Sequence, residues 1–179
     1  MSTCGLNQPW VADITYIRIV TCFVYLAIIL DAFSRRVIGY NVSRAIDTCL
    51  ALDALRMAIG VRQPASGCIH HSDRGVQYAS GDYIKELISH GFQISMSRTD
   101  NPYDNASAES FIETFKSEEV FRWEYQTMGD VHQRIPYFIE DVYNQKRLHS
   151  SLDRRPPCEF EAMVVVTQNP WQRALITSP

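Results

Sequence analysis

The first 42 residues contain three strand-like runs joined by connections too short to hold a helix. Residues 11–19 alternate between two faces, residues 22–31 are almost continuously apolar, and residues 37–42 follow a short polar turn. A continuous apolar run rich in β-branched and aromatic side chains is typical of a central, buried strand. Because short connections join antiparallel neighbours, the chain is predicted to begin as a three-stranded antiparallel meander.

The hydrophobic period then changes from that of strands to that of helices. Asp47 is suited to cap the first helix, and Pro136 is expected to kink the last. The expected helices are residues 47–60, 80–90, 104–123 and 128–147, and the expected short strands are residues 68–71 and 92–96. This order predicts an α/β fold with a five-stranded mixed sheet flanked by helices. The ribonuclease-H-like fold has this order, which other mixed α/β folds share.

The bulk composition excludes several classes of protein. A chain of 179 residues forms one domain with a core, and its net charge of -3 argues against a stand-alone, high-affinity DNA binder. Catalytic acids lower the net charge without removing local basic patches, however. Five scattered cysteines indicate neither a disulfide framework nor a zinc site. The chain has no signal-like start and no run that could cross a bilayer, so a cytoplasmic location is expected.

Three acidic residues stand where this fold would bring them together. Asp13 lies in the first strand among apolar neighbours, where a carboxylate that nothing neutralises is costly. Asp73 follows the fourth strand, and Glu109 lies one turn into a helix with 35 residues between it and Asp73. Three such acids repel one another unless divalent cations bind between them, so the pattern predicts two Mg²⁺ or Mn²⁺ ions acting on phosphodiesters. Glu113 is a rival third ligand, and three ordinary surface acids are the alternative interpretation.

Four blocks of sequence surround these acids in a fixed order. They are residues 10–17 with 25–40, residues 71–80, residues 95–118, and residues 143–152 followed by Pro156 and Phe160. Together they resemble the catalytic core of retroviral-integrase-like DDE transposases of bacterial insertion sequences, in particular the second-reading-frame protein of the insertion-sequence-three family. Four ordered blocks are far more specific than one motif. The resemblance covers residues 8–162, and residues 163–179 are expected to form an irregular tail.

The resemblance implies a ribonuclease-H-like fold with Asp13, Asp73 and Glu109 as the catalytic and metal-binding triad. It implies an enzyme that performs metal-dependent 3′-end cleavage at transposon ends and strand transfer into target DNA. A homodimer or larger assembly in the bacterial cytoplasm is expected, because strand transfer needs two DNA ends held together. The alternative is a truncated, catalytically silent fragment that binds DNA or an intact transposase and inhibits it. A ribonuclease H type nuclease is a third interpretation.

Several side chains near the triad are candidates for DNA contact. Lys116 lies seven residues after Glu109 on nearly the same helix face, and the resemblance implies that it grips a phosphate beside the scissile bond. The other candidates are His71, Arg74, Gln77, Lys146 and Arg147. Solvated or structural side chains are the competing interpretation for each of them. His70 is expected to be a core histidine, and Asp31 a structural acid.

Proteins of this family usually carry a DNA-binding segment upstream of the core. Asp13 lies so close to the start of this sequence that no such segment fits before it. We therefore expect an upstream-frame DNA-binding protein or a fused segment to recognise the transposon ends, and the chain alone to bind DNA weakly.

Overall fold

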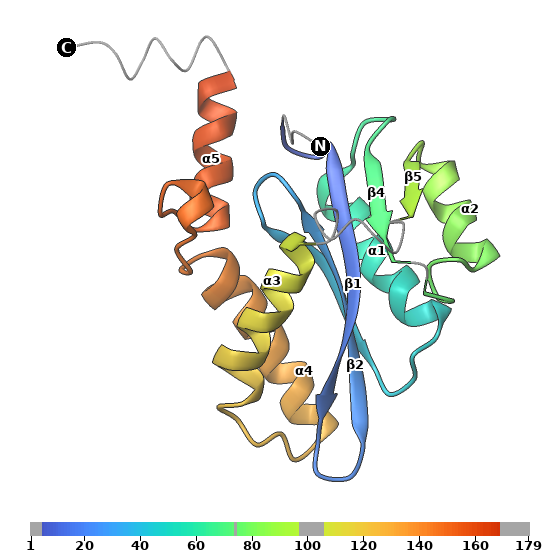
Figure 1. Ribbon diagram of the computed structural model, residues 1–179, viewed down its shortest axis with the longest axis vertical. Coiled ribbons are helices and arrows are strands. Elements are labelled where there is room, and N and C mark those ends of the chain that lie inside the picture. Colours follow the sequence, from blue (N-terminus) through green and yellow to red (C-terminus); the bar gives the residue numbers. More distant parts are fainter. Residues whose placement is uncertain (1–4, 74, 97–105, 169–179) are drawn as a thin grey trace.

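Five strands form one sheet in the order β3-β2-β1-β4-β5 in a computed structural model that describes residues 5–73, 75–96 and 106–168 (Figure 1). The first three strands pair antiparallel, β4 pairs parallel with β1, and β5 pairs parallel with β4. The predicted mixed sheet with an antiparallel meander is thus confirmed. The strands are β1 (Pro9–Arg18), β2 (Phe23–Asp31), β3 (Val37–Ser43), β4 (Ile69–Ser72) and β5 (Gln93–Met96).

Helices cover both faces of this sheet (Figure 1). α1 (Thr48–Arg62) and α2 (Gly81–Ser89) pack on the face to which β1 contributes Trp10. α3 (Ala106–Phe115) and α4 (Met128–Tyr137) pack on the opposite face, to which β1 contributes Val11 and Ile17. Alternate residues of β1 therefore enter two different cores. A sheet covered on both faces also explains why β2 is almost continuously apolar.

The first two helices begin at caps where the sequence predicted helix starts. The Asp47 carboxylate accepts a hydrogen bond from the Leu50 N–H at 3.0 Å, and the Ser80 hydroxyl accepts one from the Tyr83 N–H at 3.3 Å. Such bonds satisfy N–H groups that have no partner within the helix. Gly91 follows α2 with φ +72°, a conformation that favours glycine and ends the helix.

The two later helices were predicted as single α-helices, the second with a kink at Pro136, but both pass into π-helical segments. α3 continues as the π-helical segment η1 (Lys116–Val120), and α4 continues as the π-helical segment η2 (Phe138–Asn144). Pro136 lies inside α4 and has no N–H to donate, which accounts for a change in hydrogen-bond register just after it. Asp104 and Asn105, where the third long helix was expected to begin, lie outside the described residues.

The last helix extends beyond residue 162, where the irregular tail was expected to begin. The tail was expected to be irregular from residue 163, but α5 (Pro157–Gln168), which follows the short 3-10 turn η3 (Ser150–Leu152), continues to Gln168. Val164 is buried in this stretch, so packing stabilises it. Residues 169–179 lie outside the described part of the chain. None of the helices within the described ranges is long and apolar enough to cross a membrane.

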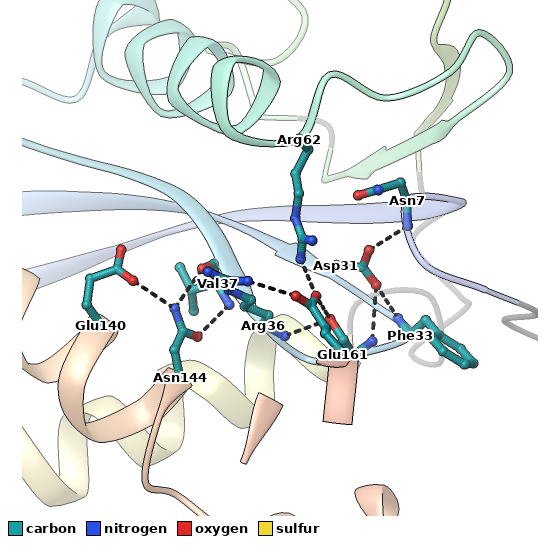
Figure 2. A network of polar contacts seen from close by, with 10 residues as sticks. Asn7, Asp31, Phe33, Arg36, Val37, Arg62, Glu140, Asn144 and Glu161 are labelled. Carbon is teal, nitrogen blue, oxygen red and sulfur yellow. Dashed lines mark hydrogen bonds and ion pairs between the residues drawn. The ribbon is translucent and has the colours of Figure 1, made fainter. Parts of the chain in front are cut away.

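One buried carboxylate, that of Glu161, fastens α5 to the rest of the fold (Figure 2). Its Oε1 accepts a hydrogen bond from the Ser34 hydroxyl at 2.6 Å, and its Oε2 accepts one from Arg36 at 2.8 Å. Arg62, the last residue of α1, also donates to Oε1. Burial acts to raise the pKa of Glu161, but these donors outweigh burial and hold the pKa below its ordinary value.

Asp31, beside this network, is completely buried at the end of β2 (Figure 2). Its carboxylate accepts backbone hydrogen bonds from Asn7 at 2.6 Å, Phe33 at 2.9 Å and Ser34 at 3.1 Å. Burial raises the pKa of Asp31 despite these bonds. Its expected structural role is confirmed, because it organises the turn between β2 and β3.

The Glu161 network makes a testable contribution to stability. We expect Glu161→Gln to lower the free energy of unfolding at pH 7 by about 3 kcal/mol, because the arginine charges lose their buried partner. Urea denaturation measures this change. The matched control Glu159→Gln, on the same helix with a side chain that is 63% exposed, should cost less than about 0.5 kcal/mol.

The pH dependence follows from the depressed pKa of Glu161. Its contribution is complete above the unfolded value of 4.5 and is lost as the pH falls through the folded pKa. The difference in the free energy of unfolding between wild type and Glu161→Gln should therefore become smaller at acidic pH. If Glu161→Gln and Glu159→Gln lowered the free energy of unfolding equally at pH 7, the anchoring role of Glu161 would be contradicted.

Candidate active site

The parallel pairing of β1 with β4 leads directly to the two predicted aspartates. Val11 on β1 pairs with His71 on β4. Continuing this register by two residues brings Asp13 level with Asp73, which directly follows β4. Residues two apart on a strand point to the same face of the sheet. The register therefore predicts adjacent positions for the two aspartates, on the face that Val11 occupies.

The third predicted acid belongs to the helix that covers this same face. Val11 shares a buried cluster with Ala108 and Phe111 of α3, and Figure 1 shows α3 beside β1. Glu109 follows the fully buried Ala108 in the first turn of α3, and Glu109 itself is exposed. Glu113 is also exposed, so exposure does not distinguish between the two candidate glutamates.

A hydrogen-bonded turn holds the Asp73 carboxylate at the end of β4. The Gly75 N–H donates to Asp73 Oδ1 at 2.8 Å, and the Gly75 carbonyl accepts from the N–H groups of Tyr78 and Ala79 at 3.0 and 3.1 Å. A Cβ atom at position 75 would lie 2.8 Å from Asp73 Oδ1. Glycine is therefore needed for this close approach, and its expected role in the turn is confirmed.

The structure does not gather the three acids into one set of ligands. Across residues 5–73, 75–96 and 106–168, no group of three His, Cys, Asp or Glu side chains lies close enough to hold a metal ion. The strand register predicts neighbouring positions for Asp13 and Asp73, and Glu109 lies on α3, which packs against β1. Convergence of all three acids on shared cations therefore stays a prediction.

Sequence reasoning missed a buried tyrosine that lies within the electrostatic influence of both aspartates. Tyr78 is 3% exposed, and its hydroxyl has no hydrogen-bond partner among the described residues. Burial, and then the negative charges of Tyr83, Asp13 and Asp73, raise its pKa well above the ordinary value. Tyr78 follows Asp73 by five residues, within the second block of resemblance. The position of Tyr78 in this block could have identified it, but only its polar neighbours Arg74 and Gln77 were considered.

His70 is the core histidine that the sequence predicted. It is completely buried, and its Nε2 lies 2.9 Å from the Tyr83 hydroxyl. Burial, and to a smaller degree the charge of His71, lower the pKa of His70 to about 3. The ring is therefore neutral at physiological pH, and it packs against the rings of Tyr83 and Phe92.

Two of the predicted DNA contacts are engaged with the protein itself. The Lys116 ammonium lies 4.6 Å from the centroid of the Tyr16 ring, a favourable cation–π distance. Gln77 donates from Nε2 to the Ile46 carbonyl at 3.2 Å, which ties the turn after β4 to the segment before α1. DNA contact by Lys116 or Gln77 remains a prediction.

The other predicted DNA contacts differ in their exposure. His71 is 5% exposed, and this burial does not support the predicted contact with DNA. Arg147 forms an ion pair with Glu118, whereas Lys146 is exposed. Arg74 lies outside the described residues.

Comparisons with known sequences point to one family. The Integrase core domain family matches residues 5–102, and a second family described as Integrase core domain matches residues 90–157. The chain is 41% identical over 155 residues to the transposase for insertion sequence element IS904 of Lactococcus lactis, covering 87% of this chain and 61% of that protein. It is 39% identical over 157 residues to transposase InsF for insertion sequence IS3A of Escherichia coli, covering 88% of this chain and 54% of that protein. The chain thus spans between half and two thirds of the length of these relatives.

Solved structures share the fold at low sequence identity. The catalytic core domain of BIV integrase superposes with a TM-score of 0.68 at 14% identity, over 90% of this chain and 98% of that chain. The HTLV-2 integrase catalytic core domain in complex with magnesium superposes with a TM-score of 0.65 at 14% identity, over 87% of this chain and 96% of that chain. These likenesses confirm the expected ribonuclease-H-like fold.

The buried neutral His70 predicts a loss of stability in mild acid. Its pKa is about 3 in the folded chain against an ordinary value of 6.5, so its contribution is complete above about pH 6.5 and is lost as the pH falls toward 3. Between pH 7 and pH 5 this one group should lower the free energy of unfolding by about 2 kcal/mol.

Urea denaturation at pH 7, 6 and 5 measures this loss. The variant His70→Gln keeps a group that can bond Tyr83 but does not titrate, so its stability should fall by about 2 kcal/mol less than that of wild type over this range. The control His132→Gln, at an exposed position of α4, should follow the wild-type curve. If the free energy of unfolding of His70→Gln fell with pH as steeply as that of wild type, His70 would not be the titrating group.

Proposed function

The chain belongs to the integrase core domain family, and we propose that it is the catalytic core of a DDE-type insertion-sequence transposase. The observation that supports this proposal is the β1–β4 register, whose last pair, Val11 and His71, stands two residues before Asp13 and Asp73 near the centre of the sheet. The relatives that share about 40% of its residues are named as transposases. The proposed activity is metal-dependent cleavage and joining of DNA phosphodiesters.

Asp13, Asp73 and Glu109 are the proposed ligands of two divalent cations, Mg²⁺ or Mn²⁺. Carboxylate oxygens are the ligands that these hard cations prefer. The HTLV-2 catalytic core, which shares the fold, has been solved with magnesium. When bound, two such ions supply an activated water or 3′-hydroxyl and neutralise the leaving oxygen of an in-line displacement.

The chain's own contribution is to hold the carboxylates in place. β1 lies between β2 and β4, and Trp10, Val11 and Ala12 are buried, so the backbone leading to Asp13 has little freedom. The Gly75 N–H orients one oxygen of Asp73. Glu109, exposed in the first turn of α3, would be the third ligand.

The proposed substrates are the ends of a transposon and a target duplex. Hydrolysis at the end frees a 3′-hydroxyl, and attack of that hydroxyl on a target phosphodiester joins the two DNAs without a covalent protein intermediate. Lys146 is the exposed cation best placed among the predicted contacts to meet a phosphate, because Arg147 is paired with Glu118. Lys116 can leave the Tyr16 ring to meet a phosphate at little cost, since exposed cation–π contacts are worth about 0.5–1 kcal/mol.

Further partners follow from the chain's charge and length. Its net charge of -3 and its span of 61% or less of the named relatives fit a core whose end recognition lies in another segment or in an upstream-frame protein. Joining two ends in one reaction requires at least two active sites, so a homodimer or larger assembly is proposed. A catalytically silent inhibitor is not favoured, because all three acids of the triad are present.

The aspartate pair gives the decisive test. Purified protein with Mn²⁺ should nick duplex DNA that carries the inverted repeats flanking its gene, and Asp73→Asn should slow this cleavage by about 1,000-fold or more, equivalent to about 4 kcal/mol of transition-state stabilisation. A denaturing gel of 5′-labelled DNA measures the rate. The folded structure should persist, because Asp73 is exposed at the end of β4.

Asp82→Asn is the matched control. Asp82 is an acid on α2 with a side chain that is 77% exposed, and its replacement should leave cleavage within about twofold of wild type. Wild-type-like cleavage by Asp73→Asn would remove this residue from the mechanism. A wild-type chain that neither cuts nor joins such DNA, yet suppresses an intact relative, would support the inhibitor instead.

A further inference from the structure

Two aromatic rings lie exposed near the end of the β1–β2 hairpin, which extends beyond α1 (Figure 1). Tyr16 on β1 is 55% exposed, and Phe23 on β2 is 50% exposed. Their rings meet edge to face, with centroids 5.5 Å apart. Tyr16 pairs with Tyr25 across the ladder, and Arg18 pairs with Phe23. Since paired residues and residues two apart point to the same face, the four side chains form one stripe on the sheet.

A lysine from the other side of the sheet reaches this stripe. The Lys116 ammonium, on the continuation of α3, lies 4.6 Å from the centroid of the Tyr16 ring. β4 pairs with β1 only over Pro9–Val11, so Tyr16 lies beyond the end of that pairing. On the β4 side, this stretch of β1 has no strand partner among the described residues. The open edge explains how a side chain from the α3 face can meet a ring on the α1 face.

The two cations beside the rings are not neutralised by the described part of the chain. Arg18 is exposed, and neither Arg18 nor Lys116 forms an ion pair with a carboxylate within the described ranges. Packing of Tyr16 on Phe23 stabilises the hairpin, but this structural role does not require unpaired cations next to the rings. Exposed rings bordered by cations are the combination that binds single-stranded nucleic acid, with bases on the rings and phosphates on the cations.

The rings stand at a defined distance from the proposed metal ligands. Tyr16 follows Asp13 by three residues, about 10 Å along a strand. Lys116 follows Glu109 by seven residues, about 10 Å along a helix. The contact between Tyr16 and Lys116 therefore marks a point about equally far along both elements. At about 3.4 Å per nucleotide, this point lies about three nucleotides from a phosphodiester bound at the acids.

We propose that Tyr16 and Phe23 bind one unpaired base of the DNA end by stacking. Lys116 and Arg18 bind the phosphates beside this base. The inference deepens the proposed function and rests on it for the placement of the DNA. A base within a duplex is covered by its neighbours in the stack, so only a base that has left its pair offers a face to the rings. Stacking would offset part of the cost of opening the duplex beside the scissile bond.

The test compares single-stranded with duplex DNA. Fluorescence anisotropy without metal measures the dissociation constants for a labelled single strand of about 12 nucleotides and for the matching duplex. Tyr16→Val removes the ring but keeps a strand-forming residue. We expect this variant to raise the single-strand dissociation constant about tenfold, the equivalent of about 1.4 kcal/mol, and to leave the duplex value within about twofold of wild type. Tyr16→Phe keeps the ring and should bind both DNAs as wild type does.

Tyr137→Leu is the matched control. It removes a tyrosine ring that is 49% exposed on α4 and keeps a helix-forming residue. Its single-strand dissociation constant should stay within about twofold of wild type. Urea denaturation verifies that each variant is folded.

Salt dependence separates stacking from charge. Arg18→Gln should reduce the slope of log affinity against log salt concentration by about 0.7, because one phosphate contact is lost. Tyr16→Val should lower the affinity without changing this slope. If Tyr16→Val changed the slope as much as Arg18→Gln does, the ring would act through the cations, and the stacking site would be wrong.

Three other results would overturn the inference. They are a single-strand affinity of Tyr16→Val within about twofold of wild type, an equal loss of duplex affinity, and no single-strand binding by wild type. A changed sedimentation coefficient of Tyr16→Val with unchanged DNA affinity would instead assign the rings to contact between two copies of the chain.

Cleavage assays distinguish this inference from the proposed function. Ring-dependent single-strand binding by a wild type that does not cut DNA would support the stacking site and remove the function. Cleavage by wild type together with ring-independent single-strand binding would leave the function and remove the stacking site.

Discussion

The parallel register between β1 and β4 is the constraint on which the candidate active site depends. Val11 opposite His71 sets Asp13 level with Asp73, and a shift of one residue would send one aspartate to the opposite face of the sheet. The register is well fixed, because β1 contributes Trp10 to one core and Ile17 to the other. Two packed cores thereby hold the backbone that leads to Asp13.

The acidic residues discussed above fall into two groups, those satisfied inside the protein and those exposed near the end of β4. Glu161 meets two arginines and a serine, and Asp31 meets three backbone N–H groups, so each is satisfied by the protein and serves the fold. Asp73 instead remains exposed while it accepts the Gly75 N–H, and it shares the electrostatic surroundings of Tyr78 with Asp13. Acids that are buried and satisfied by arginines or backbone N–H groups serve the structure, whereas the exposed Asp73 is the acid proposed to bind a cation.

The helix that carries Glu109 is anchored at its far end. In η1, the π-helical continuation of α3, Glu119 accepts two hydrogen bonds from Arg134 of α4 at 2.6 and 2.9 Å, and Glu118 pairs with Arg147. These bonds fix the C-terminal end of the helix against its neighbours. They also explain why Arg147, basic in sequence, is engaged in structure rather than free for DNA.

The sequence by itself determined the antiparallel meander and the helix starts at Asp47 and Ser80, because periodicity and capping are local properties. It also proposed the three acids, from motif spacing. It did not determine that α3 and α4 pass into π-helical segments, that α5 continues to Gln168, or that His71 is buried. Those outcomes depend on packing between segments distant in sequence, such as Glu161 against Arg62. Tyr78 belongs to the same class. Its spacing from Asp73 is visible in the sequence, but only the tertiary structure decided that its hydroxyl would be buried.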